Sequence, residues 1–335
     1  MLEHIHIEGY KSFSTENPLD IDLRNVNVMI GPNGAGKSRL VSFLDMLEVL
    51  LTAKWNNYVL GVNTDSMFYY GQSITKEIFA ELRYDDGFSC CFTLVPGEMS
   101  RVVVNTHDSD REEMASRFGG VRAYHFSDTA NKTNMRGRSH QSQFGELYTD
   151  GSNLVAFLLR LHDAYNWYYR RIVERIRLIM PQFEDFVLEP NDAGYLWLEW
   201  NDRSSVRRTF TPNDLSDGSL RFIALTTLLL QPPKLMPKLL VIDEPELGLH
   251  PAAIDAVNDM IKEASFHTQI VVATQSPTLI DAFDPDCIMV AESRNNNGLY
   301  YSSVKRLDRS ALDDWLKEYT VSDLWYKNIL GGLPL

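Results

Sequence analysis

The sequence predicts an α/β fold organised around a loop that binds phosphate groups, and three observations support this prediction. A glycine-rich segment, GPNGAGKS at 31–38, follows an apolar run and leads into a helical pattern. A second apolar run ends in the adjacent carboxylates Asp243 and Glu244. Alternating apolar and polar residues flank an Asp-Gly turn at 86–87, which predicts an antiparallel sheet beside the core that carries the loop.

Length and composition restrict the class of protein. A chain of 335 residues can bury a large core in one domain or two, and its 44% hydrophobic and 23% charged residues are typical of soluble proteins. No apolar run approaches the about 18–20 residues of a membrane span, and residues 1–7 lack the pattern of a signal peptide. The three cysteines form no disulfide framework or metal-ligand spacing, so we expect a cytosolic protein with no membrane contact.

A protein that binds nucleic acid over its whole surface is expected to be basic throughout. The net charge of −13 argues against such a surface. Nucleic-acid binding would therefore have to depend on a local patch. The four arginines Arg170, Arg171, Arg175 and Arg177 form such a candidate patch on an amphipathic helical segment. A solvated helix face is the alternative reading, because runs of charge usually have only that role.

Periodicity and turn signals give the expected elements in chain order. We expect an irregular segment at 55–71, a polar and turn-rich region at 106–152, and a long mobile loop at 131–148 within it. The expected strands are 2–8, 21–23, 26–30, 77–84, 88–95, 101–105, 195–200, 205–210, 239–242, 269–274, 287–291 and 299–304. The expected helices are 38–52, one or two within 154–179, one ending near 230, 251–265, a short one after 277, and 310–329.

The loop at 31–38 has the residue types that phosphate binding requires. Its glycines allow successive backbone N–H groups to point at phosphate oxygens, and the following helix adds positive potential at its N-terminus. Lys37 can reach the β- and γ-phosphates, and the Ser38 hydroxyl can hold Mg²⁺. The candidate nucleotide-binding residues here are Asn33, Gly34, Ala35, Gly36, Lys37, Ser38 and Arg39.

Two further motifs complete a candidate catalytic constellation. Asp243, at the end of a buried strand, can hold Mg²⁺, and the adjacent Glu244 is placed to polarise an attacking water as general base. The segment LSDGS at 215–219 can present the Ser216 hydroxyl and the Gly218 N–H to a γ-phosphate. Taken alone, this last motif is equally well explained as an ordinary helix cap.

These motifs, followed by Thr274-Gln275-Ser276-Pro277, resemble the ABC-type ATPases and, among them, the SMC/RecF-like branch. The segment GYKSF at 9–13 is similar to the start of SMC heads. A group of stand-alone bacterial ATPases is more similar still. It shares the island 124–129, DGSNL at 150–154 and DEPELGLHP at 243–251. Its nearest biological themes are DNA repair and antiphage defence.

The resemblance implies a P-loop NTPase of the ABC/SMC-head type, with a mixed central sheet, an antiparallel β subdomain and a helical insertion. Residues 1–105 and 192–335 would form the ATPase head, and 106–191 the insertion. Two heads would sandwich two ATP molecules, each site joining Lys37 and Ser38 of one chain to Ser216 and Gly218 of the other. ATP and Mg²⁺ are the implied ligands, and hydrolysis would release the homodimer.

Two departures from the family pattern bear on the mechanism. Gln275 stands where many relatives have a histidine. It can hydrogen-bond a γ-phosphate but cannot titrate near neutral pH, which suits a sensor with slow turnover. No heptad region or CxxC hook interrupts the chain, so it cannot tether DNA over long distances. Gln72 is a candidate for the Q-loop glutamine or, equally, a solvent-exposed loop residue.

Three functions stay open. The first is a dimerising ATPase that acts on DNA or in a defence complex. The second is a nucleotide-sensing regulator of an effector protein, which the acidic net charge favours over a DNA clamp. The third is the nucleotide-binding subunit of a transporter, against which Gln275, the GYKSF start and the long insertion argue.

Overall fold

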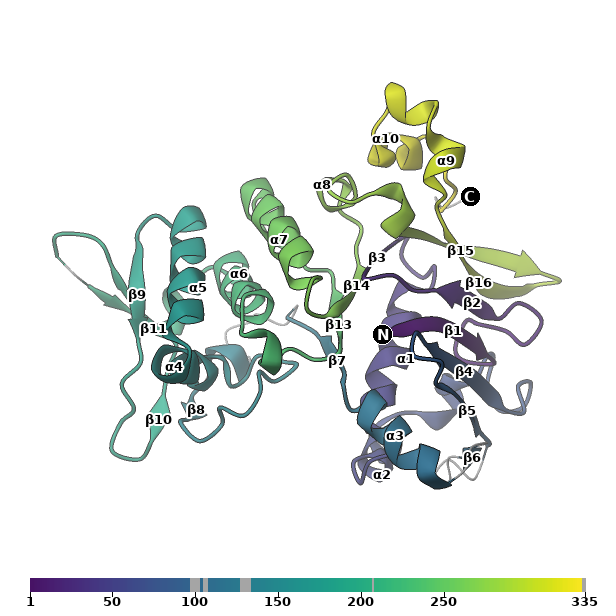
Figure 1. Cartoon of the computed structure of the whole chain (residues 1–335), viewed down its shortest axis with the longest axis horizontal. Coiled ribbons are helices and arrows are strands. Elements are labelled where there is room, and N and C mark those ends of the chain that lie inside the picture. Colours follow the sequence, from purple (N-terminus) through teal and green to yellow (C-terminus); the bar gives the residue numbers. More distant parts are fainter. Residues whose placement is uncertain (97–102, 105–107, 127–133, 207, 333–335) are drawn as a thin grey trace. The chain divides into compact units, whose positions relative to one another are not determined.

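The computed structural model describes residues 1–96, 103–104, 108–126, 134–206 and 208–332 (Figure 1). They form two compact units. The first, here the P-loop unit, comprises Met1–Ala123, Pro237–Ile242 and Gln269–Leu335, and the second, here the helical unit, comprises Tyr124–Met236 and Asp243–Thr268. The division into 1–105, 106–191 and 192–335 made from the sequence stays a prediction.

A six-stranded sheet forms the centre of the P-loop unit. Strands β14 and β15 run parallel to β3, and β16 runs antiparallel to β15, so the sheet is mixed, as predicted. All five residues of β3 are buried, because elements cover both faces of this strand. The strand order is β16 (Leu299–Arg306), β15 (Ile288–Asn296), β3 (Val26–Ile30), β14 (Gln269–Ala273), β13 (Leu239–Asp243) and β7 (Val121–Tyr124).

A five-stranded sheet is the predicted antiparallel part of this unit. Helix α1 (Lys37–Leu50) contributes to the core shared with this sheet: Phe43 stacks on Phe92 with ring centroids 6.2 Å apart and meets Tyr10 edge-on at 5.5 Å. The described strands, in order, are β2 (Leu19–Asp22), β1 (Leu2–Glu8), β4 (Ile78–Tyr84), β5 (Ser89–Leu94) and β6 (Val103–Val104). The remaining residues of the predicted strand 101–105 lie outside the described part.

Three expectations for the P-loop unit are wrong. The segment predicted as irregular contains α2 (Trp55–Gly61) and η1 (Thr64–Met67). The polar region after it contains α3 (Asp108–Phe118), a helix held by Met114 and Phe118, whose spacing of four places both buried side chains on one face. The tail forms α9 (Arg309–Leu312), η6 (Trp315–Lys317) and α10 (Val321–Tyr326) instead of one helix, after α8 (Pro277–Ile280) and η5 (Pro285–Cys287).

The helical unit is built on four helices. Figure 1 shows α5 (Asn166–Ile179), α6 (Asp217–Leu229) and α7 (Pro251–Ala264) side by side, and α4 (Leu154–Ala164) packs against α5. Every residue of α6 from Leu220 to Leu229 is buried. Two small sheets join these helices, one of β8 (Ser139–His140) and β10 (Tyr195–Leu196), the other of β9 (Phe183–Val187), β11 (Glu199–Asp202) and β12 (Thr209–Phe210). The 3₁₀ turns are η2 (Asn134–Arg136), η3 (Pro212–Asp214) and η4 (Pro233–Leu235).

The described part of the segment expected to be a mobile loop, 134–148, is fixed by one buried side chain, so that expectation is wrong there. Asn153 is fully buried, and its amide donates to the carbonyls of Gln143 and Glu146, both at 2.7 Å. Its carbonyl oxygen accepts from the N–H of Tyr148 at 2.8 Å. Because three backbone groups of the segment depend on this amide, the asparagine of DGSNL orders it.

Among the described residues, no helix has the length and hydrophobicity needed to cross a membrane.

Candidate functional site

The P-loop lies between β3 and α1, and its glycines are required by the strands around it. Gly31 has φ +150°, and a Cβ there would lie 2.4 Å from the carbonyl oxygen of Ala291. Gly36 has φ +119°, and its Cβ would lie 2.5 Å from the Ser302 hydroxyl. Any side chain at either position would therefore displace β15 or β16.

Lys37 and the start of α1 have the geometry of an anion site. The Lys37 side chain is 5% exposed, and its ammonium donates to the carbonyls of Gly31 at 2.6 Å and Pro32 at 3.1 Å. Within the described residues, no side chain caps the N-terminus of α1 at Gly36. The dipole of α1 favours an anion at this uncapped end.

The structure brings the switch glutamine to the P-loop, as the sequence predicted for a shared site. Gln275 follows β14, and its amide donates to the Asn33 side-chain oxygen at 2.9 Å. The preceding residue, Thr274, donates its N–H to the Met29 carbonyl at 3.0 Å, which holds the end of β14 against β3. Asn33 and Gln275 therefore move together with the loop that carries Lys37.

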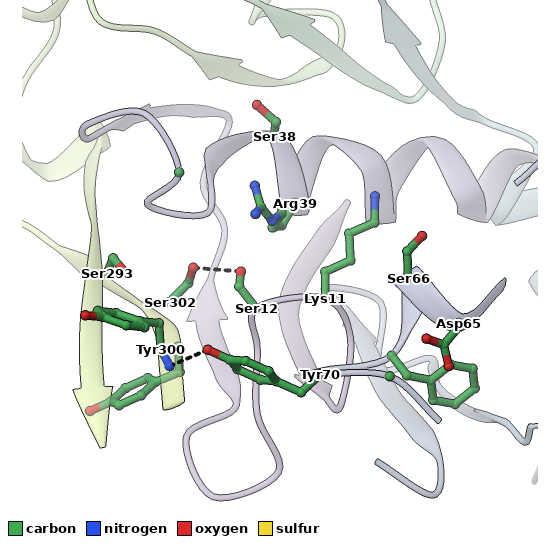
Figure 2. Close-up of a pocket in the computed structure, with 14 residues that line it drawn as sticks. Lys11, Ser12, Ser38, Arg39, Asp65, Ser66, Tyr70, Ser293, Tyr300 and Ser302 are labelled. Carbon is green, nitrogen blue, oxygen red and sulfur yellow. Dashed lines mark hydrogen bonds between the residues drawn. The ribbon is translucent and has the colours of Figure 1, made fainter. Parts of the chain in front are cut away.

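A cavity of about 610 Å³ adjoins the P-loop within the same unit (Figure 2). Ser38 and Arg39 line it from α1, and Lys11 reaches it from the turn after β1. Burial, followed by the nearby Arg39 guanidinium, lowers the pKa of Lys11. Two cations and one carboxylate, Asp65, therefore line a cavity next to the phosphate loop, and the positive excess suits an anionic ligand.

The far wall of this cavity was not predicted from the sequence. Tyr300 and Tyr301 enter from β16, and the Tyr70 hydroxyl accepts the backbone N–H of Tyr300 at 2.8 Å (Figure 2). Lys11 and Tyr70 have φ of 49° and 51°, a conformation that costs a non-glycine residue about 1–2 kcal/mol. Such strain concentrates at ligand sites. Of Lys11 and the three tyrosines of this wall, only Lys11 had a sequence signal, because it belongs to GYKSF.

The two carboxylates predicted for metal binding and catalysis follow one strand. Asp243 is the last residue of β13, and Glu244 begins the turn after it with φ 46°. The turn is closed by the N–H of Leu247, which donates to the Glu244 carbonyl at 3.2 Å. Glu244 is thus, after Lys11 and Tyr70, a third residue of the predicted site and its surroundings that holds a left-handed conformation without being glycine.

The LSDGS segment is both a helix cap and an exposed surface. Ser216 caps α6 by accepting the Ser219 N–H at 3.1 Å, and Ser216 itself is exposed. Gly218 packs on the loop that follows Glu244, because a Cβ at Gly218 would lie 2.3 Å from the Gly248 carbonyl oxygen. The cap predicted as the alternative exists, and the Ser216 hydroxyl also shares a hydrogen bond with the Ser219 hydroxyl at 2.8 Å.

The remaining predicted residues lie elsewhere. Gln72 does not line the cavity, and its amide donates to Thr64 at 3.4 Å. Arg171 pairs with both carboxylate oxygens of Glu263 at 2.6 and 2.8 Å, and Arg177 donates to the Glu184 carbonyl at 2.9 Å. Of the arginine patch, Arg170 is exposed and Arg175 is half-buried. Ser127–Thr129 of the predicted island lie outside the described residues.

The fold and this set of motifs define a P-loop domain whose fold resembles that of SMC heads. A family model described as "AAA domain, putative AbiEii toxin, Type IV TA system" matches residues 26–281, and the chain belongs to that family. No curated protein matches the chain.

Solved structures show the same fold at low sequence identity. An SMC head bound to the C-winged helix domain of ScpA is 14% identical, with a TM-score of 0.65, and the match covers 92% of this chain and 99% of that one. The Thermotoga maritima SMC head domain is 18% identical over 92% and 99%, with a TM-score of 0.52. A Pyrococcus furiosus SMC head with an extended coiled coil, bound to the C-terminal domain of ScpA, is 14% identical over 95% and 98%, with a TM-score of 0.60.

Proposed function

We propose that this chain binds ATP with Mg²⁺, forms a homodimer around two ATP molecules and hydrolyses them slowly as a molecular switch. The observation that carries the proposal is the P-loop with the Asn33–Gln275 hydrogen bond beside a cavity of about 610 Å³ that two cations face. A cavity of this size accommodates a nucleoside, and the adjoining loop provides the donors for its phosphates.

The candidate nucleotide-binding residues of the P-loop unit would have separate roles. The backbone N–H groups from Asn33 to Arg39 surround the phosphates, and the Lys37 ammonium exchanges its loop carbonyls for β- and γ-phosphate oxygens. The Gln275 amide, already positioned by Asn33, reads the γ-phosphate. Because an amide does not titrate, this contact stays the same across neutral pH.

The donors proposed for Mg²⁺ fit that ion. A serine hydroxyl from Ser38 and a carboxylate from Asp243 are hard oxygen ligands, and Mg²⁺ completes its shell with phosphate oxygens and water. Among the described residues, no group of three or more His, Cys, Asp or Glu side chains could hold a metal ion by itself. When bound, the ion would neutralise charge on the phosphates, and Glu244 would accept a proton from the attacking water.

Dimerisation would complete each site. Ser216 is exposed, and Gly218 has a backbone fixed by Gly248, so both can meet the γ-phosphate held by the P-loop of a partner subunit. Leu247, in the loop after Glu244, is 47% exposed and gives the dimer an apolar contact. ATP would thus join the two chains and hydrolysis would release them.

For the biological role, we place the switch in a cytoplasmic defence or DNA-repair complex. The description of the family names a toxin system, which supports a role in defence. The alternative is a nucleotide-sensing subunit that controls an effector protein. The net charge of −13 favours this alternative, as do the contacts of Arg171 and Arg177 within the fold, which leave Arg170 and Arg175 as the candidate DNA contacts.

Steady-state ATP hydrolysis, measured with and without duplex and single-stranded DNA, tests this function. Lys37→Ala provides the background. Hydrolysis above that background supports the ATPase, and stimulation by DNA supports the DNA role over the regulator. Wild-type protein that neither binds nor hydrolyses ATP above the Lys37→Ala level would refute the proposal.

A further inference from the structure

Arg221 is a buried charged residue that the proposed site does not yet use. It lies in the second turn of α6 and is 4% exposed, in a helix whose following residues are all buried. Burying a guanidinium is costly unless partners satisfy it, so its contacts define its role.

The partners of Arg221 come from two other segments of the helical unit. Its Nε donates to the Phe126 carbonyl at 2.9 Å in a buried hydrogen bond. On the other side its Nη1 lies against Gly248, where a Cβ would approach to 3.1 Å. The guanidinium therefore lies between the island after β7 and the loop that follows Glu244.

The same loop contacts the LSDGS turn directly. Gly218 packs so closely on Gly248 that a Cβ there would lie 2.3 Å from the Gly248 carbonyl oxygen. Consecutive turns then connect Gly248 back to Glu244: Leu249 donates to the Glu246 carbonyl at 3.0 Å, and Leu247 donates to the Glu244 carbonyl at 3.2 Å. A shift of Gly218 must therefore be transmitted to this short loop.

Charge adds to the packing. Burial lowers the pKa of Arg221, while the carboxylates of Asp217, Glu244 and Glu246 raise it. An arginine remains protonated in proteins, so the guanidinium attracts all three carboxylates, although the ion pair of Asp217 is with Arg136 at 2.7 Å. Asp217 belongs to the LSDGS turn, and the two glutamates belong to the loop after β13.

We propose that Arg221 is a positioning residue that joins the LSDGS turn to the Glu244 loop, so that a nucleotide contacted by Ser216 and Gly218 sets the position of Glu244 in the same chain. The inference rests on the proposed function. In the dimer, Ser216 and Gly218 would serve the ATP of the partner subunit, whereas Glu244 serves the chain's own ATP. Arg221 therefore couples hydrolysis at one site to occupancy of the other.

The role requires the shape of arginine as well as its charge. Nε is committed to the Phe126 carbonyl, and Nη1 lies on Gly248, so the planar fork spans both segments. A lysine keeps the charge but has one compact ammonium, which cannot reach both. Lysine should therefore restore part of the function, and a neutral residue of similar length should restore none.

The test compares Arg221→Met and Arg221→Lys with wild type in ATP hydrolysis, nucleotide binding and thermal stability. Misplacing a catalytic group by about 1 Å can cost about 100-fold, so we expect kcat to fall about 100-fold in Arg221→Met, with KM for ATP within about threefold. The kcat of Arg221→Lys should lie between those of wild type and Arg221→Met. Thr226→Val is the matched control, because Thr226 is fully buried in the same helix and its hydroxyl has no hydrogen-bond partner in the described chain.

A second measurement separates positioning from a loss of fold. In the Glu244→Gln background, Arg221→Met should lower kcat no further, because the group that Arg221 positions is already absent. Wild-type kcat in Arg221→Met, or an additive loss in the double variant, would overturn the inference while leaving the ATPase proposal intact. Equal loss in Arg221→Lys and Arg221→Met, with weakened nucleotide binding and a lower Tm, would also overturn it in favour of a structural role.

Discussion

Replacing Gly218 by alanine tests the contact between the LSDGS turn and the loop after Glu244. The new Cβ would lie 2.3 Å from the Gly248 carbonyl oxygen, and real Cβ atoms essentially never approach closer than 3.0 Å. The two backbones must therefore separate by about 0.7 Å. Alanine gains up to about 1 kcal/mol of helix propensity over glycine, but overpacking costs about 1–3 kcal/mol. The cost of overpacking therefore exceeds the gain in helix propensity.

We expect Gly218→Ala to lower the free energy of unfolding by about 1–2 kcal/mol and to reduce ATP-driven dimerisation and hydrolysis about 10- to 100-fold. ATP binding by the monomer should not change, because the P-loop belongs to the other unit. Differential scanning calorimetry, fluorescent-nucleotide titration and sedimentation velocity measure these quantities. Gly61→Ala is the control, since a Cβ there has open space and no strained φ. Wild-type dimerisation in Gly218→Ala would refute the packing argument.

Three further predictions follow from other contacts. Gln275→Ala loses the hydrogen bond to Asn33, worth about 1 kcal/mol, so KM for ATP should rise about fivefold in steady-state kinetics; an unchanged KM would contradict the switch role. Asn153→Ala leaves three backbone groups unpaired, so proteolysis within 134–148 should accelerate and stability should fall by about 3 kcal/mol; unchanged cleavage would contradict the anchor. Burial lowers the pKa of His6, but hydrogen bonds to Glu8 and Asp20 raise it more, to a net value above 6.5. Protonated His6 therefore stabilises the fold, and its contribution is fully present below the pKa of the unfolded chain. The contribution should disappear as the pH rises through the raised pKa of the folded state. Denaturation measured at several pH values should show this loss in wild type and not in His6→Gln.

The sequence was sufficient for those parts of the fold whose signals are local. The P-loop and the Asp-Gly hairpin were predicted because each depends on a short run of residues with a distinct period or glycine pattern, whereas the mixed sheet was expected only from the family resemblance. Helix α3 was missed because, among residues 112–118, whose burial is described, only Met114 and Phe118 are buried, and two apolar residues give no measurable period.

The candidate site was predictable only in part for the same reason. The Asn33–Gln275 hydrogen bond joins residues 242 positions apart, and the wall of Tyr70 and Tyr300 joins residues 230 apart. Nothing in either local segment indicates its partner. The loop 134–148 is ordered by one amide just beyond its end, Asn153, whereas its polar composition alone indicated mobility.

The central claim is that ATP joins two of these chains, and the Glu244→Gln variant tests it most directly. This variant should bind ATP but not hydrolyse it, so the dimer should accumulate. Sedimentation velocity with ATP and Mg²⁺ should show a dimer that is absent without nucleotide and absent in the Glu244→Gln/Lys37→Ala double variant. A Glu244→Gln protein that binds ATP and stays monomeric at high concentration would contradict the account.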